Sequence, residues 1–597
     1  MAVSGWIRRY RQLICAGLAL LLYLAGLGRP PLWEPDEGRY AEVAREMVVT
    51  NDYITPRNNF VRYFEKPPLV YWVTATALKV FGRNEFAVRL QAAIASVGQV
   101  AIAGALSETM FGPTAGLLAA LALALSPLFF AFARCATPDP ALAFFLTAAM
   151  ACFYKGVQSS QLPRGIDDRW MLAAAAMLAL GTLTKGPVAL LLGGAIAMLW
   201  LLLEGRSRGG LRIPWLKCAG LYLALTLPWF IAVARRNPGF LHFFIIHEHF
   251  ERYIASTEHG WGPWFFVPIT IAGTWPWSYF APLALTSSAV HFRLSLWPFR
   301  RKPFAAQAAV IDPEDESGRD AVHFLLIWFA VILVFFSIPR SKLVQYILPA
   351  LPPIAILAGR GLARIEELPG AQRRLLFIIF AGLNAAAAIT ITAGILIEPL
   401  RGFSHALAGN AFIAAAALLA GGVAPLFLAG RNVGTVMVPL AVSVIVAIGA
   451  GLDARERVAP FVSYRKLGGI VAPYTNRGCR LMSYGHFEQA LPFYTGVRET
   501  LVNYRGELEP FGPLRDRDGK VFATVAQLKT AWAAEQCAVL VANRSDLPTL
   551  VNLLSPAPTL IGCEGKKLAL YNRPLDAAPP TECLSAVSGN PNSGQKS

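Results

Sequence analysis

Long apolar stretches separated by short polar segments fill about the first 450 residues of the chain. A helix crosses a bilayer with about 20 consecutive apolar residues. The pattern therefore predicts a polytopic α-helical membrane protein with about thirteen transmembrane helices. The predicted spans are residues 13–28, 87–106, 114–133, 138–155, 170–184, 186–203, 215–234, 265–286, 322–338, 343–358, 375–397, 410–429 and 434–452.

The pattern changes near residue 455, where polar and apolar residues begin to mix over short distances. Residues 538–541 and 568–571 are typical of strands, and residues 525–536 are typical of a helix. We therefore expect a transmembrane catalytic domain at 1–455, a soluble α/β domain at 456–585 and a disordered tail at 586–597.

Composition supports a membrane protein and excludes two other classes. Hydrophobic residues make up 55% of the chain and charged residues only 15%, and the mean hydropathy is +0.46. Soluble globular proteins and disordered proteins carry far more charge. The net charge of +17 fits basic residues that gather at lipid headgroups, so we expect membrane lipids and no nucleic acid as partners.

Basic residues predict the orientation. Three arginines at positions 8, 9 and 11 precede the first span, and no signal-peptidase site follows it. We expect a retained first helix with a cytoplasmic N-terminus. An odd number of spans then places the loops 29–86 and 235–264, and the residues after 453, on the outer side.

The eight cysteines divide evenly between the two regions. Four lie in or beside predicted spans: Cys15, Cys135, Cys152 and Cys218. Four lie in the predicted external domain: Cys479, Cys537, Cys563 and Cys583. In an oxidising compartment the second set predicts two disulfides, with three pairings open.

Carboxylates stand at the outer ends of two predicted spans. Asp36 and Glu37 begin an amphipathic segment after the first span, and Asp139 opens the fourth. Such residues are typical helix caps, and they also suit acid–base chemistry or the binding of a cation. The two roles are compatible, so both stay open.

Two further clusters lie on the same predicted side, at residues 247–253 and 340–346, together with Lys185. Lys and Arg at this position suit the binding of phosphates. Transporters usually hold ionisable groups near the middle of the bilayer, whereas these charges gather at one face. The pattern therefore favours an interfacial enzyme over a transporter of lipid-linked sugars.

Five motifs carry a resemblance to a known family: WEPDEGRYAEVAREM…RYFEKPPLVYW in the first loop, then TPDP, TKG, EHFERY and SKLVQYILP. They resemble the bacterial lipid A aminoarabinose transferases, which are polyprenyl-phosphate-dependent integral-membrane glycosyltransferases of the GT-C type related to protein O-mannosyltransferases. The family's Leu-Asp-Pro and Pro-Thr-Tyr correspond here to Pro138-Asp139-Pro140 and Val344-Gln345-Tyr346, so Asp139 and Tyr346 are retained.

The resemblance implies transfer of 4-amino-4-deoxy-L-arabinose from undecaprenyl phosphate to lipid A phosphates, at the periplasmic face of the bacterial inner membrane. The product would lower negative surface charge and give resistance to polymyxin. A lipid A phosphate is already ionised, so Asp36, Glu37 and Asp139 are expected to bind the sugar ammonium, a metal or a hydroxyl group. The expected phosphate-binding residues are Arg39, Arg62, Lys66, Arg252, Lys342 and Tyr346.

Glu65 and His249 are expected to share a divalent metal, zinc or magnesium, since a carboxylate oxygen and an imidazole nitrogen both suit zinc. Two alternative functions stay open. One is a polyprenyl-phosphate glycosyltransferase with another acceptor, similar to a protein O-mannosyltransferase. The other is a transporter of lipid-linked sugars.

Overall fold

The computed structural model describes residues 2–159, 167–204, 213–251, 260–285, 313–396, 401–504, 506–508, 521–574 and 583. Contacts divide the chain into two compact units. The first contains residues 1–25, 65–70 and 90–454, and the second contains residues 26–64, 71–89 and 455–597. Most of the first predicted loop therefore groups with the C-terminal residues, which the sequence pattern does not reveal.

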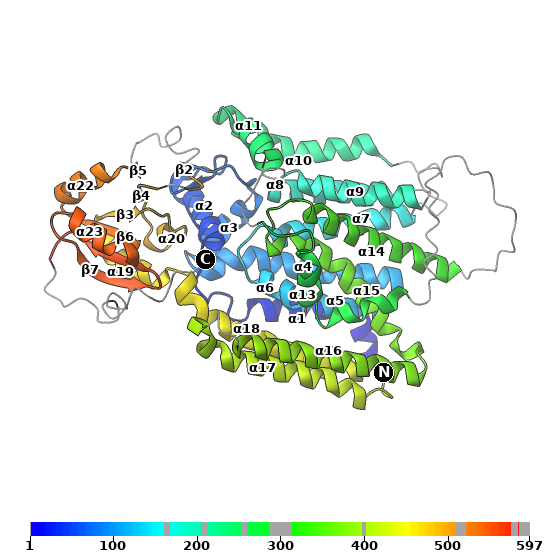
Figure 1. The fold of residues 1–597 in the computed structure, drawn as a ribbon. Coiled ribbons are helices and arrows are strands. Elements are labelled where there is room, and N and C mark those ends of the chain that lie inside the picture. Colours follow the sequence, from blue (N-terminus) through cyan, green and yellow to red (C-terminus); the bar gives the residue numbers. More distant parts are fainter. Residues whose placement is uncertain are drawn as a thin grey trace. The chain divides into compact units, whose positions relative to one another are not determined.

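The first unit is built from helices (Figure 1). Its α-helices, some of which continue into the second unit, are α1 (Ala2–Leu24), α4 (Glu85–Phe111), α5 (Pro113–Ala124), α6 (Pro127–Ala133), α7 (Asp139–Ser159), α8 (Asp168–Lys185), α9 (Val188–Leu203), α10 (Trp215–Arg236), α11 (Phe240–His242), α13 (Phe266–Gly273), α14 (Pro313–Ser337), α15 (Leu351–Ala363), α16 (Gly370–Leu396), α17 (Arg401–Phe427) and α18 (Val433–Val462). Its π- and 3-10 segments are η2 (Phe243–Glu251), η3 (Trp277–Tyr279), η4 (Ala281–Leu285), η5 (Val344–Ala350) and η6 (Ile365–Glu367).

Membrane-spanning helices form the larger part of this unit, as the sequence predicts. Within the described residues, eight helices are long and apolar enough to cross a membrane, or nine if one bent pair forms a single span. The predicted count of thirteen is not confirmed. Several other apolar helices are shorter, such as Gln12–Leu24 and Val188–Leu203.

Two of the predicted spans are interrupted. In the predicted span 265–286, the described residues 265–285 form three short segments, α13, η3 and η4, instead of one helix. Residues 114–133 form α5 and α6, whose axes differ by 63°. Pro276 immediately precedes η3 and Pro127 opens α6, and proline removes a backbone donor and restricts the residue before it. The apolar pattern predicts burial at these segments but does not show the break.

Close helix packing in the first unit depends on small residues. A Cβ atom on Gly359 of α15 would lie 2.6 Å from the carbonyl oxygen of Ala115 in α5. Nearby helices bury a group of large aromatic side chains, in which Trp200 contacts Tyr154 and Phe324. Such packing holds the ends of these helices, where the charged side chains lie, in fixed positions.

The second unit combines the first loop with an α/β sheet. The loop contributes α2 (Asp36–Thr50), the hairpin strands β1 (Arg57–Asn58) and β2 (Val61–Arg62), and most of α3 (Leu69–Phe81). The sheet strands are β3 (Arg480–Tyr484), β4 (Glu499–Val502), β5 (Phe522–Ala523), β6 (Ala538–Asn543), β7 (Thr559–Glu564) and β8 (Lys567–Tyr571). The helices around it are α19 (Arg465–Thr475), α20 (Leu491–Thr495), α22 (Val525–Ala534) and α23 (Leu547–Leu553), with the 3-10 turn η9 (Arg544–Asp546).

The sheet has the order β5-β4-β3-β6-β8-β7. The pairs among β5, β4, β3 and β6 are parallel, whereas β8 and β7 are antiparallel. Apolar residues cover both faces of the sheet, with Trp532 of α22 on one and Leu467 of α19 on the other. The predicted α/β class, the strands at 538–541 and 568–571, and the helix at 525–536 are confirmed.

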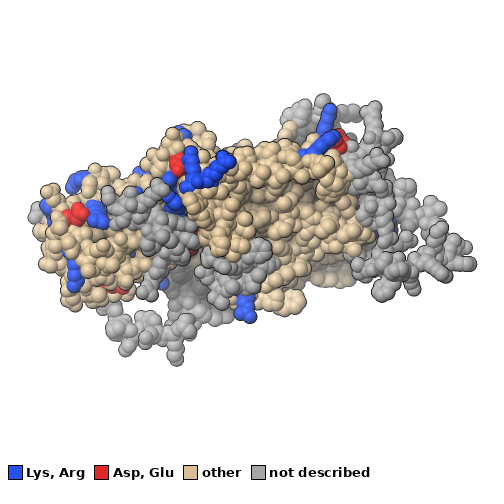
Figure 2. All heavy atoms as spheres, turned by 90° about the horizontal axis from the view of Figure 1, so that it is seen from above, with Lys and Arg blue, Asp and Glu red and all other residues tan. Residues whose placement is uncertain are grey.

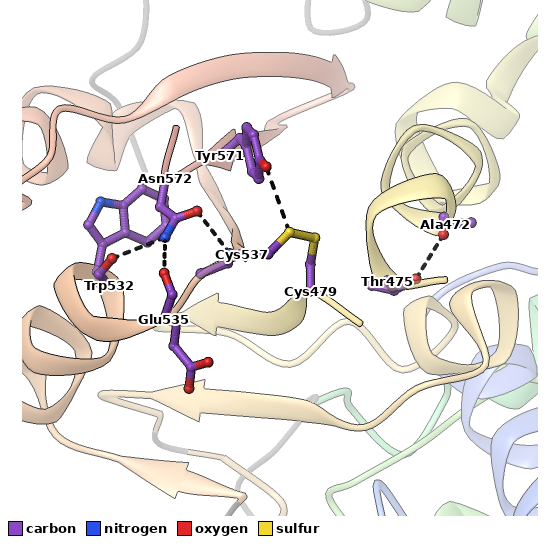
Figure 3. The surroundings of a disulfide bond; sticks show 9 residues. Ala472, Thr475, Cys479, Trp532, Glu535, Cys537, Tyr571 and Asn572 are labelled. Carbon is purple, nitrogen blue, oxygen red and sulfur yellow. Dashed lines mark hydrogen bonds between the residues drawn. A yellow bond between two sulfur atoms is a disulfide. The ribbon is translucent and has the colours of Figure 1, made fainter. Parts of the chain in front are cut away.

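Both predicted disulfides are present, and the structure resolves their pairing as Cys479–Cys537 and Cys563–Cys583. Cys479 and Cys537 each directly precede a strand, β3 and β6, and these two strands are neighbours (Figure 3). The side chain of Asn572 accepts from the backbone N–H of Ala538 at 2.9 Å. This end of the sheet is therefore fixed by a covalent bond and by side-chain hydrogen bonds.

Charged side chains are scarce on the face of the protein drawn in Figure 2. Most of the described surface there carries neither acidic nor basic residues, and the charges gather in a few groups. This distribution is typical of a protein whose helices face lipid.

Candidate functional site

The first group of site residues joins the ends of three elements in the first unit. Asp139 opens α7, Lys185 closes α8 and Tyr346 lies in η5. The ammonium of Lys185 donates to Asp139 Oδ1 and lies 4.2 Å from the centroid of the Tyr346 ring. The carboxylate stands at a helix N-terminus and the ammonium at a helix C-terminus, as the helix dipoles favour. Asp139 therefore holds a cation that comes from another helix, which a simple cap would not do.

Lys66 is the centre of a second group in the same unit. Its ammonium donates to Glu248 Oε2 at 3.3 Å and to the backbone oxygen of Glu65 at 3.1 Å. Glu248 lies in the π-helix η2, a type of segment that is frequent at functional sites. Lys66 is one of the six predicted phosphate-binding residues, and the structure holds it between acidic residues of two segments.

The predicted metal pair, Glu65 and His249, gains no support from these contacts. The Glu65 carboxylate lies 3.9 Å from the ammonium of Lys66, which disfavours a cation there. The side chain of His249 lies outside the described part of the structure. Among the described residues no group of three or more His, Cys, Asp and Glu side chains converges on one point. The metal site stays a prediction, and no step below depends on it.

Lys342 lies beside a cavity of about 660 Å³. Its ammonium donates to the backbone oxygens of Trp261, at 3.0 Å, and Pro339, and the residue is only 2% exposed. Burial lowers the pKa of this ammonium below its usual value. The cavity lining combines apolar and basic residues: Gly260, Trp261, Gly262, Pro263, Val334, Ser337, Ile338, Arg340 and Lys342. Such a lining suits an amphiphile with a charged head.

The second unit contains the acidic pair of the first loop, and the two residues differ in their surroundings. Asp36 is the first residue of α2, after Pro35 at the cap position, and no side-chain cap bond forms. Of the two roles left open for Asp36, helix capping is therefore wrong, because Asp36 lies inside the helix and Pro35 holds the cap position. Its carboxylate is 37% exposed and lies 3.7 Å from Arg39, which in turn donates to Glu507 at 2.8 Å. Asp36 is thus accessible to a ligand.

Glu37 is 3% exposed and bound by two arginines. Arg89 donates to both of its oxygens at 2.7 Å, and Arg455 donates to Oε2 at 3.1 Å. The backbone N–H of Trp33 also donates to Oε2 at 3.0 Å. A catalytic role for Glu37 stays a prediction, and its contacts favour a positioning role for the start of α2.

The remaining predicted residues have less definite surroundings. Arg62 lies in β2 and pairs with Arg57 across the hairpin. Arg252 lies outside the described residues. Asp139, Lys185 and Tyr346 thus come together in the first unit, while Asp36, Glu37 and Arg39 come together in the second.

Buried carboxyl groups in the second unit join the first loop to residues near β3 and β4. The Glu34 carboxylate accepts from the backbone N–H groups of Gln489 and Ala490, at 3.1 and 2.6 Å. Burial, and then the charge of Glu488, raise the pKa of Glu34 well above its usual range. Burial likewise raises the pKa of Glu499, which accepts from the Ser483 hydroxyl at 2.8 Å.

Sequence reasoning did not identify Arg89, Arg455 and Glu507 as partners of the acidic pair. One signal was available, since Arg89 is a charged residue inside the apolar segment 87–106. For Arg455 and Glu507 the sequence offers no such signal, because the residues that they bind are more than 400 positions away.

Two family profiles match separate parts of this chain. The profile of the family described as dolichyl-phosphate-mannose-protein mannosyltransferase matches residues 65–231. The profile described as aminoarabinose transferase C-terminal domain matches residues 467–569. The undecaprenyl phosphate-α-4-amino-4-deoxy-L-arabinose arabinosyl transferase of Edwardsiella ictaluri is 31% identical over 412 residues, 67% of this chain and 68% of the relative.

The chain belongs to the aminoarabinose transferase family.

A second relative from this family, in Proteus mirabilis, is 31% identical over 64% of this chain and 65% of its own length. The matched segment thus spans about two thirds of both relatives. The crystal structure of the family member ArnT from Cupriavidus metallidurans, bound to undecaprenyl phosphate, has a TM-score of 0.82. It is 26% identical, and the likeness covers 97% of this chain and 100% of that chain.

The family profiles include part of the site. Glu65, Lys66, Asp139 and Lys185 lie within the mannosyltransferase profile. The sheet of the second unit, except for the last two residues of β8, lies within the aminoarabinose transferase profile. Asp36 and Tyr346 lie outside both profiles.

Proposed function

We propose that this chain transfers 4-amino-4-deoxy-L-arabinose from undecaprenyl phosphate to a phosphate group of lipid A, at the periplasmic face of the bacterial inner membrane. One observation carries the proposal: a single chain combines a mannosyltransferase-type membrane segment with an aminoarabinose transferase C-terminal domain. The name of the Edwardsiella ictaluri relative gives the donor, and the resemblance in the first-loop motifs gives the acceptor.

In this reaction a lipid A phosphate oxygen attacks C1 of the sugar, and a new C1–O bond forms. The bond from C1 to the undecaprenyl phosphate oxygen breaks, and its electron pair stays on the departing phosphate. The acceptor is already ionised, so no proton has to be removed. The departing phosphate gains one negative charge, and cations that face it lower the barrier.

The described residues divide these tasks. Lys66 and Lys342, held by backbone oxygens and carboxylates, are suited to bind a phosphate. Lys185 serves the same purpose while Asp139 and Tyr346 fix its position. Asp36, which is accessible and only loosely paired with Arg39, is suited to bind the sugar ammonium. The cavity beside Lys342 suits the first isoprene units of the donor.

Mass spectrometry of lipid A tests the proposal in cells that lack this protein and in the same cells supplied with it. An added mass that corresponds to an aminopentose supports it. Unchanged lipid A, with the protein present in the membrane, contradicts the acceptor. Glycosylated membrane proteins in such cells would favour an O-mannosyltransferase-like function. A reporter that is active only in the periplasm, fused after residue 452, tests the orientation.

A further inference from the structure

Two arginines of the second unit lie over the ring of Phe60, and a third lies beside Gly496. Arg498, between α20 and β4, has its Cζ 4.8 Å from the centroid of the Phe60 ring. Arg45 of α2 has its Cζ 5.8 Å from the same centroid. Arg83, in the turn between α3 and α4, has its Nη1 next to Gly496. The three side chains come from segments that are far apart in the sequence.

The backbone around Phe60 is unusual for an aromatic residue. Phe60 and Asn59 form the turn between β1 and β2, with φ angles of 62° and 54°. Positive φ values are uncommon for residues other than glycine, and they are strained for bulky ones. Both oxygens of the Glu46 carboxyl accept from the Phe60 N–H at 2.9 Å, which holds the turn in place. The arginines over the ring offset part of the strain through cation–π attraction.

Gly496 leaves the space that Arg83 occupies. Its φ angle is +80°, and a Cβ atom there would lie 2.6 Å from Arg83 Nη1. The carbonyl oxygen of Gly496 also accepts from Arg45 Nη1 at 3.4 Å. The absence of a side chain at Gly496 therefore lets two guanidinium groups approach the same backbone segment.

The charges in this group are unequally compensated. Arg45 donates to both oxygens of Glu42 at 2.6 Å, so its charge is paired. Within the described ranges of the chain, Arg83 forms no ion pair, and it is exposed. Partial burial of Arg83, and then the positive charge of Arg45, lower its pKa, and the charge of Glu42 opposes them in part. Placing like charges together costs free energy, which a bound anion would recover.

The neighbours of Arg83 indicate where such an anion comes from. Val80 and Phe81, at the end of α3, are 68% and 50% exposed. Arg83 lies two residues before the start of α4, a membrane-spanning candidate. Exposed apolar residues next to a basic residue at the end of a span are typical of a segment at the lipid headgroups.

We propose that Arg83 and Arg498, seated on Phe60 and Gly496, form a binding site for a phosphate group, supplied by an anionic lipid headgroup at the membrane surface. The guanidinium groups bind the phosphate as forks, and Phe60 holds Arg498 in position. The exposed residues Val80 and Phe81 contact the acyl chains. This site is separate in its residues from the groups around Lys185, Lys66 and Lys342, and it does not depend on the proposed transfer reaction.

Native mass spectrometry of the full chain in a neutral detergent tests the site, with phosphatidylglycerol, phosphatidylcholine and inorganic phosphate as three separate probes. We expect Arg83→Gln with Arg498→Gln to retain phosphatidylglycerol about fivefold less than the wild type. Arg477→Gln changes an exposed arginine of the same unit and should retain it fully. Phosphatidylcholine should bind the wild type and the double variant equally, because its headgroup carries no net charge.

Three outcomes test whether the site exists and which ligand it binds. Loss of phosphatidylglycerol in the double variant alone supports the lipid source. Loss of inorganic phosphate binding, with no change in lipid binding, supports the phosphate site and identifies free phosphate as its ligand. Equal binding of every probe by the wild type and the double variant overturns the proposal. If the double variant does not fold, Arg83→Gln alone provides the test, since no described ion pair depends on Arg83.

Discussion

Arg89 binds both carboxylate oxygens of Glu37, through Nε and Nη2, at 2.7 Å each. The other Arg89 donor, Nη1, reaches the backbone oxygens of Leu27 and Pro30. One fully buried guanidinium thus fixes the chain before α2 and the first turn of α2 itself. Asp36, the residue next to Glu37, is positioned by this contact.

Removal of Arg89 should therefore destabilise the second unit. We expect Arg89→Ala to lower the free energy of unfolding by about 3–5 kcal/mol, because Glu37 would lose its main counter-charge while buried. Thermal unfolding of the full chain in detergent measures the change. Arg477→Ala, at an exposed position, should have almost no effect. Equal unfolding temperatures for the two variants would show that Arg89 is not an anchor.

The carboxylates at the two helix starts should matter for activity. We expect Asp36→Asn and Asp139→Asn each to reduce transfer about tenfold or more, since each variant keeps the shape of the side chain and removes its charge. Asp168→Asn is the matched control, because Asp168 also opens a helix and pairs with a lysine, the exposed Lys217, but lies in none of the candidate site groups. Full activity in Asp36→Asn and Asp139→Asn would remove both from the catalytic machinery.

A donor that lacks the 4-amino group separates two roles for Asp36. If Asp36 binds the sugar ammonium, the wild type should use this donor poorly, and Asp36→Asn should discriminate less between the two donors. Equal losses on both donors would indicate contact with a hydroxyl group instead.

The start of α2 packs closely against α20. A Cβ atom on Gly38 would lie 2.5 Å from the backbone nitrogen of Ala490. We expect Gly38→Ala to destabilise the protein by about 1–3 kcal/mol, although alanine alone favours a helix by about 1 kcal/mol. Gly469 of α19 faces open space, so Gly469→Ala should leave stability unchanged or raise it. The same response in both variants, measured by thermal unfolding, would show that α2 is not tightly packed there.

Stability should fall as the pH rises, through the buried carboxyl group of Glu499. In the unfolded chain this group loses its proton at about pH 4.3. In the folded chain, burial raises its pKa. Between the pKa of Glu499 in the unfolded chain and its pKa in the folded chain, the folded state keeps a proton that the unfolded state releases. The protonated group therefore stabilises the fold fully at low pH, and this contribution is lost as the pH rises through the pKa of the folded chain. The wild type should therefore unfold at a lower temperature at about pH 8 than at about pH 5, and Glu499→Gln should show a smaller difference. The part that remains in the variant comes from other buried carboxyl groups with a raised pKa, such as Glu34. An equal pH dependence in both proteins would exclude this role.

The disulfides should protect four of the eight cysteines. Thiol labelling of denatured, unreduced protein should modify only Cys15, Cys135, Cys152 and Cys218. The bridges close segments of 58 and 20 residues, which predicts stabilisation of about 4 and about 3 kcal/mol. Labelling of any other cysteine would contradict the pairing.

The sequence predicts the parts of this fold that depend on composition and local pattern. The apolar runs identify most membrane helices, and the strand at 538–541 follows from its continuous apolar residues. The break between α5 and α6 was missed, because hydrophobicity is the same on both sides of Pro127. Likewise, residues 265–286 carry no charged side chain, and their mainly apolar pattern does not show that α13 ends at Gly273 and that η3 begins after Pro276.

In the candidate site, too, the sequence predicts the local motifs but not the contacts between distant residues. Asp36, Asp139, Lys66 and Tyr346 stand in motifs that the sequence displays directly. The pairing of these residues is not visible in the sequence, because an ion pair such as Asp139 with Lys185 requires the ends of two helices to meet. The distinction between the accessible Asp36 and the enclosed Glu37 also depends on burial by distant residues.

The contact of Glu34 with Gln489 and Ala490 has a consequence for biosynthesis, because 455 positions separate Glu34 from Gln489. A ribosome adds about 5–20 residues per second, so the first loop waits roughly 20–90 s for these backbone partners. During that time its acidic residues face water, where they are ionised and stable. The loop can therefore take its final form only after the last membrane helix has been inserted, and a chain that terminates early leaves it without its partners.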